Sequence, residues 1–193
     1  MTSARLVETL VLLVAPLGAY HRVSVGFPGV VRAGRVLTAP NLGHDGWTGF
    51  GLAAALTEAL GKPVRVANDA AVQGLAVVAG KGVEMIVTLG TGFGAGLFAH
   101  GRLAPDLELA HYVFRKGETY EAQLGNAARK RVGNKKWNKR VKKAIGTLRA
   151  LTAFDHLYLG GGNAKKIDFE LDPDVTIVAN EAGIEGGIAL WRD

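Results

Sequence analysis

An adjacent amide and carboxylate, Asn68-Asp69, stand where a predicted strand meets a predicted helix. The β-branched run that starts at Val64 is typical of a buried strand, and residues 70–78 are rich in helix formers. A polar pair at such a junction lies at the carboxyl edge of a sheet, where open α/β sheets bind ligands. Asp69 could act there as a helix N-cap or as a general base that takes a proton from a substrate hydroxyl. The local pattern leaves both interpretations open.

Residues 90–96 form a glycine-rich stretch, Gly-Thr-Gly-Phe-Gly-Ala-Gly, after an apolar strand predicted over residues 84–89. A dinucleotide-binding loop would open a helix, but the apolar residues 97–99 predict a second strand and therefore a hairpin. Backbone N–H groups of a tight Thr-Gly turn can hold a phosphate, because glycine permits close approach. A plain turn is the alternative.

Glu108 and His111 are three residues apart, so one helical turn could direct both at one ligand. Two such groups make a poor metal site on their own, and a surface ion pair is the alternative.

Residues 129–143 carry nine Lys and Arg residues, among them Lys135, Lys136, Lys139 and Lys142. The segment also holds part of an apolar stripe at helical spacing: Trp137, Val141, Ile145, Leu148 and Leu151. We therefore predict one helix with a basic outer face. Such faces are commonly only solvated, but this density of charge also suits a polyanion, and nucleic acid is a further alternative.

The composition sets limits on the class of protein. The chain has 193 residues, 48% of them hydrophobic, and a net charge of +6, which favours anionic partners. The complete lack of cysteine excludes disulfide scaffolds and thiolate metal sites and fits a cytoplasmic protein. No apolar run reaches membrane-spanning length. Residues 3–16 predict a packed helix through Leu6, Leu10, Leu13 and Leu17, with a secretory leader as the alternative.

The remaining patterns predict helices and strands that alternate in both halves. Strands are expected at residues 22–27, 156–159 and 175–178, a hairpin at 30–37, and helices at 48–60 and 184–191. Glycines at residues 80–82 mark a boundary. We expect two related α/β lobes, residues 1–80 and 81–193, with a cleft between them.

The order of these motifs resembles the ROK family of sugar kinases, which have the two-lobe actin-like ATPase (ribonuclease H-like) fold. Residues 25–31 resemble the family's strand and Pro-Gly turn, and Asn68-Asp69 its catalytic pair. Residues 108–111, Glu-Leu-Ala-His, resemble its Glu-Leu-Gly-His motif with Ala110 in place of glycine. Further matching segments are residues 41–42 with Trp47, 89–92, 120–122, 159–162 and 182–184.

This resemblance implies a glucokinase in which Asp69 deprotonates the 6-hydroxyl of glucose or a related hexose. The sugar-binding residues that it implies are Gly29, Asn41, Asn68, Glu108, His111 and Glu121. The phosphate-binding residues are Gly90, Thr91 and Gly92, and the nucleotide-side loop is Gly160, Gly161 and Gly162.

The donor follows from the same resemblance. Many family members carry a Cys-rich zinc loop, which this chain cannot form, so we expect no structural zinc and no protein metal site. The Cys-free branch is similar to polyphosphate glucokinases, which implies polyphosphate or ATP as donor, with Mg²⁺. The basic residues Lys135, Lys136, Lys139 and Lys142 suit such a polyanion. We also expect a homodimer that binds neither membrane nor nucleic acid.

One departure concerns the start of the chain, where nothing matches the family's first phosphate motif, Asp-x-Gly-Gly-Thr. We therefore expect an incomplete first lobe and a Met1 that is internal to a longer reading frame. The alternatives to an active kinase are a non-catalytic sugar-binding or regulatory protein of the same family and an inactive truncated remnant.

Overall fold

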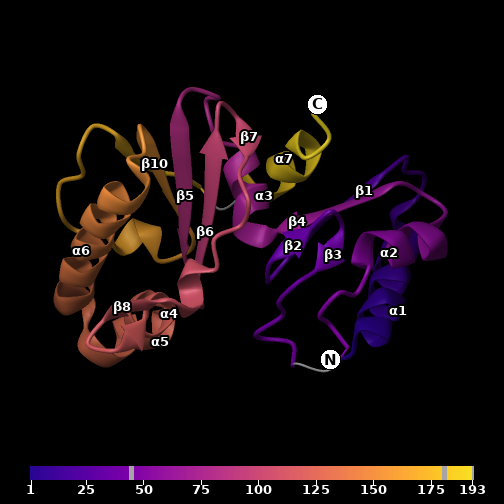
Figure 1. Cartoon of the computed structure of the whole chain (residues 1–193), viewed down its shortest axis with the longest axis horizontal. Coiled ribbons are helices and arrows are strands. Elements are labelled where there is room, and N and C mark those ends of the chain that lie inside the picture. Colours follow the sequence, from indigo (N-terminus) through magenta and orange to yellow (C-terminus); the bar gives the residue numbers. More distant parts are fainter. Residues whose placement is uncertain (44–45, 180–181, 193) are drawn as a thin grey trace.

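The computed structural model describes residues 1–43, 46–179 and 182–192, and it contains two separate parallel or mixed sheets side by side (Figure 1). The smaller sheet pairs β1 (Val23–Phe27) with β4 (Val64–Asn68) in parallel. Its register sets Phe27 opposite Asn68, so both strands end at the same edge. This edge faces the second sheet and carries the Asn68-Asp69 pair.

The core beside the smaller sheet is built around Trp47, which is 1% exposed and donates its indole N–H to the Met1 carbonyl. Helix α2 (Leu52–Leu60) buries Leu52 and Leu56 there, and Gly61 ends it in the left-handed conformation, as expected of a C-cap. A short hairpin, β2 (Val31–Arg32) with β3 (Arg35–Val36), confirms the hairpin predicted at residues 30–37.

Helix α1 (Ser3–Val14) packs on this core less extensively than its leucine spacing predicts. Leu6 and Leu10 contact the core, but Leu13 and Leu17 are 61% and 72% exposed, so the expected contact of these two residues is wrong. The α-helix stops at Val14, and the 3₁₀ turn η1 (Ala15–Leu17), which contains Pro16, changes the direction of the side chains that follow. In the described part of the chain, no helix is long and apolar enough to cross a membrane.

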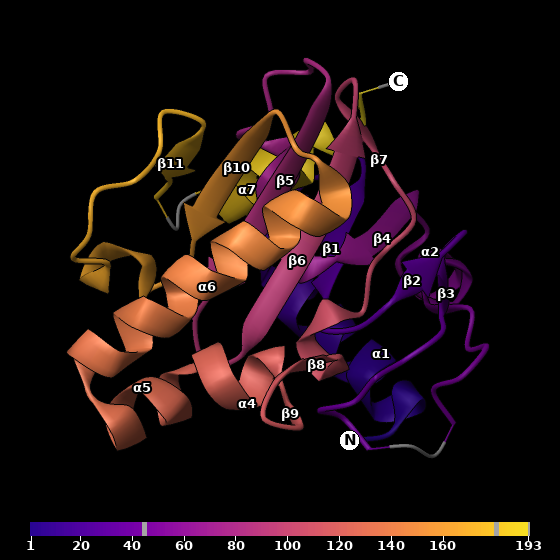
Figure 2. The same ribbon diagram turned by 60° about the vertical axis from the view of Figure 1, so that its left-hand side comes forward.

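The larger sheet has the strand order β11-β10-β5-β6-β7. The bounds of its strands are β5 (Val83–Leu89), β6 (Phe93–Ala99), β7 (Arg102–Leu103), β10 (His156–Gly160) and β11 (Val175–Ile177). Strands β5 and β6 pair antiparallel with Leu89 opposite Phe93, which confirms that the glycine-rich stretch forms a hairpin. Helix α6 (Asn134–Thr152) crosses one face of this sheet (Figure 2) and buries Trp137, Val141 and Leu148 against it.

The basic segment departs from the single helix that we predicted over residues 129–143. Helix α5 (Asn126–Val132) ends at Gly133, whose φ of 77° breaks the helical path, and α6 begins directly after it. Leu151 was expected in the apolar stripe, but it is 64% exposed, so that assignment is wrong. It lies in the last turn of α6, where the helix passes beyond the sheet contacts made through Leu148.

Shorter elements fill the region between β7 and α5. They are η2 (Leu109–His111), β8 (Val113–Arg115), β9 (Glu118–Thr119) and α4 (Tyr120–Leu124), and η3 (Ala164–Lys166) follows β10 later in the chain. Tyr120 is buried against Phe93, which anchors α4 beneath the end of the β5–β6 hairpin.

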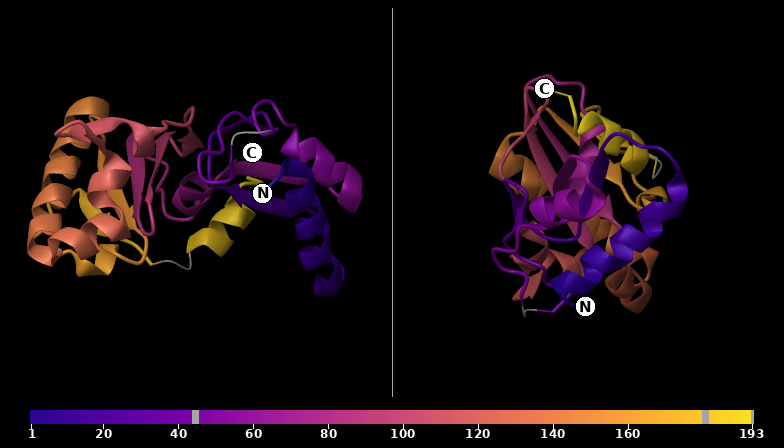
Figure 3. Two further views of the ribbon diagram at one scale, coloured as in Figure 1. Left: turned by 90° about the horizontal axis from the view of Figure 1, so that it is seen from below. Right: turned by 90° about the vertical axis from the view of Figure 1, so that its right-hand side faces the viewer.

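The last helix, α7 (Ala182–Ala189), packs against α3 (Asp69–Leu75) and β1 rather than against the larger sheet (Figure 3). The Ser24 hydroxyl donates to the Gly187 carbonyl, and the Trp191 indole N–H donates to Ser24 Oγ at 2.8 Å. A Cβ on Gly186 would lie 1.7 Å from the Val72 carbonyl oxygen, so only glycine permits this close approach. The division of the chain at residue 80 stays a prediction, and parts of residues 81–193 pack on the first half: α7 as well as β5 and β6 contact α3.

Candidate active site

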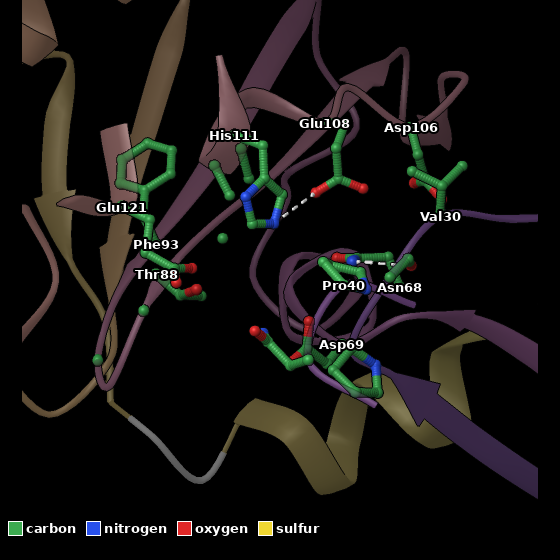
Figure 4. Close-up of a pocket in the computed structure, with 18 of the residues that line it drawn as sticks. Val30, Pro40, Asn68, Asp69, Thr88, Phe93, Asp106, Glu108, His111 and Glu121 are labelled. Carbon is green, nitrogen blue, oxygen red and sulfur yellow. Dashed lines mark hydrogen bonds and ion pairs between the residues drawn. The ribbon is translucent and has the colours of Figure 1, made fainter. Parts of the chain in front are cut away.

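A cleft of about 660 Å³ lies between the edge of the β1–β4 sheet and the β5–β6 hairpin (Figure 4). The sequence-predicted residues that line it are Gly29, Asn41, Asn68, Asp69, Gly90, Thr91, Gly92, Glu108, His111, Glu121 and Gly161. These residues come from seven separate segments, which the packing of the two sheets brings together.

Of the two functions that we weighed for Asp69, the helix N-cap belongs to the neighbouring Asn68. The Asn68 side-chain oxygen accepts from Ala70 N–H at 2.9 Å and Ala71 N–H at 3.2 Å, so Asn68 is the N-cap of α3. Asp69 is the first helical residue, and the N-cap interpretation of Asp69 is therefore wrong. The Ala70 N–H is shared, because Asp69 Oδ1 also accepts from it, at 2.8 Å. Figure 4 shows the Asp69 carboxylate directed into the cleft.

Burial raises the pKa of the Asp69 carboxyl group above its ordinary value. Desolvation is the largest cause, the hydrogen bond from Ala70 N–H acts in the opposite direction, and the negative charge of Glu108 adds to the increase. A carboxylate with a raised pKa is a stronger base than an ordinary aspartate once it is deprotonated, which suits proton abstraction from a hydroxyl group.

The Pro28-Gly29-Val30 turn forms another wall of the cleft. A Cβ on Gly29 would lie 2.1 Å from the Thr38 carbonyl oxygen, so the hairpin admits only glycine here. The Asn68 side-chain amide donates to the Gly29 carbonyl at 3.2 Å, which ties this turn to the start of α3.

Glu108 and His111 face each other in the cleft, with Glu108 Oε1 and His111 Nε2 3.9 Å apart. The 3₁₀ turn η2 brings them to the same side, as the three-residue spacing predicts. Both side chains remain partly open, at 34% and 41% exposure, so they are accessible to a ligand. Glu121, from α4, reaches the cleft beside the glycine turn, and a Cβ on Gly92 would lie 2.6 Å from its Oε2.

The turn at residues 90–92 is oriented by contacts on its outer side. The Gly90 carbonyl accepts from Asn126 N–H at 3.0 Å and from the Asn163 side-chain amide at 3.1 Å, and the Thr91 carbonyl accepts from Asn126 N–H at 3.2 Å. In a planar trans peptide the N–H points opposite to the C=O. The N–H groups of Thr91 and Gly92 therefore point away from Asn126, as an anion-binding turn requires.

Only one of the three glycines in the predicted nucleotide-side loop reaches the cleft. Gly161 lines it with a φ of +85°, and a Cβ there would lie 2.5 Å from the Leu89 carbonyl oxygen. Gly160 belongs to β10, and neither Gly160 nor Gly162 is among the lining residues.

The cleft also contains polar residues that the sequence analysis did not single out: Gln73, Thr88 and Asp106. Gln73 lies one helical turn after Asp69, so the helical period alone could have identified it. Thr88 precedes the glycine turn by two residues. Asp106 lies in a loop without periodicity, and nothing in its sequence context points to the cleft.

A second concavity of about 330 Å³ lies between the β8–β9 hairpin and α6 and is lined by six cationic residues: Arg115, Lys116, Lys136, Lys139, Arg140 and Lys143. We call it the basic groove. Lys136 and Lys139 were predicted to bind a polyanion, whereas Lys135 and Lys142 do not line the groove. Lys142 instead places its ammonium group 5.7 Å from the centre of the Phe169 ring.

Two arginines of the basic groove are held in place by α4. Arg115 donates to Gln123 Oε1 at 2.9 Å, and Arg140 donates to the Gln123 carbonyl at 3.2 Å. Desolvation, followed by the positive charges of Arg115 and Arg131, lowers the pKa of the Arg140 guanidinium below its ordinary value. The cations of this groove repel one another, so an anion that enters it relieves the repulsion.

The mixed α/β fold matches solved structures of ROK sugar kinases, which have the actin-like ATPase fold, and its cleft brings the Asp69 carboxylate, the Glu108–His111 pair and the glycine turn together. The chain belongs to the ROK family, whose model matches residues 1–105.

Known proteins support this assignment over most of the chain. The polyphosphate glucokinase of Mycobacterium tuberculosis (strain CDC 1551 / Oshkosh) is 30% identical over 175 residues, which is 86% of this chain and 66% of that protein. The polyphosphate glucokinase of Mycobacterium leprae is 28% identical over 176 residues, 86% of this chain and 54% of that protein. The chain thus spans between about half and two thirds of the length of these relatives. The crystal structure of an inorganic polyphosphate/ATP-glucomannokinase from Arthrobacter sp. strain KM matches with a TM-score of 0.84 and 31% identity, covering 98% of this chain and 83% of that one.

Proposed function

We propose that this chain supplies the sugar-binding cleft and catalytic base of a ROK-type glucokinase, which transfers a phosphoryl group from polyphosphate or ATP to the 6-hydroxyl of glucose. The observation that carries this proposal is the meeting of Asp69, the partly exposed Glu108–His111 pair and the 90–92 turn in one cleft. The similarity to polyphosphate glucokinases supports the choice of acceptor and donor.

In this proposal Asp69 accepts the proton of the sugar hydroxyl as that oxygen attacks the terminal phosphorus of the donor, and the bond from phosphorus to the leaving phosphate oxygen breaks. Asn68 fixes the start of α3 and the Gly29 carbonyl together, so the base and the sugar-side turn keep a constant spacing. Positioning of this kind accounts for much of the catalysis in phosphoryl transfer.

The remaining polar groups would hold the hexose. Glu108 and Glu121 can accept hydrogen bonds from sugar hydroxyls, while Asn41, Asn68 and His111 can accept or donate them. The Gly29 backbone would lie against the sugar. A site built to hydrogen-bond each hydroxyl discriminates strongly against sugars that lack one, because the unmatched protein group then stays unpaired.

The donor phosphates would contact the N–H groups of Thr91 and Gly92, with Gly160, Gly161 and Gly162 on the nucleotide side when ATP is the donor. Mg²⁺ would enter with the donor, because Mg²⁺ in such sites is held largely by phosphate oxygens and water. It would neutralise charge on the transferred phosphate. The residues that the structure describes include no group of three or more His, Cys, Asp or Glu side chains that could hold a metal ion.

The basic groove suits the outer part of a polyphosphate chain. Its six cationic side chains line one concavity, and the bonds to Gln123 already order two of its arginines before an anion binds. Helix α4 joins the groove to the cleft, because it carries both Gln123 and Glu121. Of the four lysines predicted from the sequence, we therefore assign the larger effect to Lys136 and Lys139, and the smaller to Lys135 and Lys142.

Coupled assays of glucose 6-phosphate formation, with ATP and with polyphosphate as separate donors, test the proposal. We expect transfer from at least one donor. Hexose binding without transfer from either would favour the non-catalytic alternative, and the absence of both would favour an inactive remnant. Light scattering of the purified chain tests the proposed homodimer, and fractionation of the source cells tests the cytoplasmic location.

A paired charge reversal tests the groove. Lys136→Glu with Lys139→Glu should weaken polyphosphate binding at least tenfold and flatten its salt dependence, because fewer cations remain to be screened. Lys165→Glu with Lys166→Glu makes the same change in net charge outside the groove and should have a much smaller effect. Equal effects of the two pairs would refute a defined site.

A further inference from the structure

The turn at residues 29–31 is held by three different side chains through three successive backbone groups. The Gly29 carbonyl accepts from the Asn68 amide at 3.2 Å, and Val30 N–H donates to Thr38 Oγ1 at 3.0 Å. Val31 N–H donates to Asp106 Oδ2 at 3.2 Å. The first two contacts stay within the first half of the chain, whereas the third crosses to the loop that carries Glu108.

Thr38 makes a second connection between these segments. Its hydroxyl accepts from Val30 N–H and at the same time donates to Glu108 Oε2 at 2.9 Å. A hydroxyl group can accept and donate at once, which neither a methyl group nor a carboxylate can do. The other oxygen of Glu108 faces His111 Nε2 at 3.9 Å, so the Glu108 carboxylate is oriented from both sides.

The Asp106 carboxylate is partly buried and only partly hydrogen-bonded. Its Oδ1 atom is buried and has no hydrogen-bond partner among the described residues. Burial, with a smaller contribution from the charge of Glu108, raises the pKa of the Asp106 carboxyl group, although the bond from Val31 N–H opposes the increase. A buried polar atom without a partner costs free energy. Asp106 Oδ2 nevertheless keeps its bond from Val31 N–H, in the turn across the cleft.

We propose that Thr38 and Asp106 form a clasp across the cleft, and that this clasp positions the Glu108 carboxylate for the hexose. Both are positioning residues, since they act through Glu108 and the 29–31 turn. The clasp connects Glu108 on one side of the cleft, through the 29–31 turn, to Asn68 and Asp69 on the other side. Hexose affinity therefore depends on Thr38 and Asp106 even if neither touches the hexose. That the ligand is a hexose rests on the proposed function. The hydrogen bonds of the clasp themselves do not depend on which phosphoryl donor is used.

The hydroxyl of Thr38 gives the sharpest test. Thr38→Val should weaken glucose binding about tenfold, measured calorimetrically without donor, and raise the KM for glucose while leaving kcat within about twofold, as loss of uniform binding predicts. Thr38→Ser keeps the hydroxyl and should restore affinity to within about twofold. Thr147→Val removes a hydroxyl that bonds only within α6, and it controls for the substitution itself. Unchanged glucose affinity in Thr38→Val, or equal defects in the Val and Ser variants, would overturn the proposal.

Asp106 gives an independent variant and a readout that needs no ligand. Asp106→Asn keeps an oxygen that can accept from Val31 N–H and should be mild, whereas Asp106→Ala should weaken glucose binding about as much as Thr38→Val. Amide exchange of Val31 should speed up at least tenfold in Asp106→Ala and not in Asp106→Asn. A wild-type chain that binds no hexose would refute the proposed function, and the exchange rates would then decide the clasp alone, with unchanged exchange at Val31 overturning it.

Discussion

Glu84 is 1% exposed, yet its carboxylate is fully engaged, and replacing it should be strongly destabilising. Oε1 accepts from Ala79 N–H at 2.6 Å and from the Tyr158 hydroxyl at 2.9 Å. Oε2 accepts from Gly80 N–H at 2.7 Å and Lys81 N–H at 2.9 Å. These bonds order the loop that leads from α3, which carries Asp69, to β5, which leads to the glycine turn.

Glu84→Gln keeps the shape of the side chain, but only one of its two terminal atoms is still an oxygen that can accept hydrogen bonds. The new NH₂ group must face at least one backbone N–H, which is left without an acceptor at a cost of about 1–3 kcal/mol. The bonds that remain lose the strengthening that comes from the negative charge. We expect a loss of about 3 kcal/mol in the free energy of unfolding, on the order of a 100-fold change in the folding equilibrium. Tyr158→Phe removes one donor and leaves every backbone group bonded, so its cost should be about 1 kcal/mol.

Urea unfolding followed by circular dichroism measures both variants, and the pH dependence provides a second test. Although desolvation by itself would raise it, the four hydrogen bonds hold the pKa of the Glu84 carboxyl group below its ordinary value. The unfolded chain therefore binds this proton more tightly than the folded chain does. The stabilisation is complete above the unfolded pKa, about 4.3, and is lost as the pH falls through the folded pKa. A Glu84→Gln cost below about 0.5 kcal/mol at pH 7, or a cost that does not shrink in acid, would refute this account.

Three further predictions concern the cleft and the α3–α7 contact. Asp69→Asn should lower kcat at least 100-fold with little change in hexose affinity, because only the base is lost; wild-type turnover in this variant would contradict the assignment. Since burial raises the pKa of Asp69 and its deprotonated form is the active one, the wild-type kcat/KM should rise with pH through a value above the ordinary aspartate pKa of about 3.9; a rate that is already constant at that pH would count against it. Gly186→Ala should destabilise the chain by about 2–3 kcal/mol in thermal or urea unfolding, because its Cβ would overlap the Val72 carbonyl, whereas Gly187→Ala meets only ordinary contacts at 3.5 Å and should be nearly neutral. Equal effects of the two alanines would argue against the close α3–α7 packing.

Local signals in the sequence were sufficient for most strands of the two main sheets and for most of the longer helices. The β-branched run at Val64 and the glycine-rich stretch at residues 90–96 act through their own backbone preferences, so their strand and hairpin followed from neighbours alone. Which residue of the Asn68-Asp69 pair caps α3 did not follow in this way. Many of the polar residues that line the cleft could be named because each belongs to a short motif whose order along the chain resembles that of the ROK family, whereas Gln73, Thr88 and Asp106 were missed.

Only the tertiary structure decided which of these groups meet and what else joins them. Thr38 and Asp106 carry no local signal, because their contacts join residues 70 and 75 positions apart in the chain, across the cleft. The basic groove likewise needs the β8–β9 hairpin beside α6, which adds Arg115 and Lys116 to lysines that helical spacing alone places on one face. Leu151 has the spacing of a buried residue but lies beyond the sheet that would cover it. Periodicity predicts which side of a helix is apolar, whereas the extent of the surface that it packs against is set by other parts of the chain.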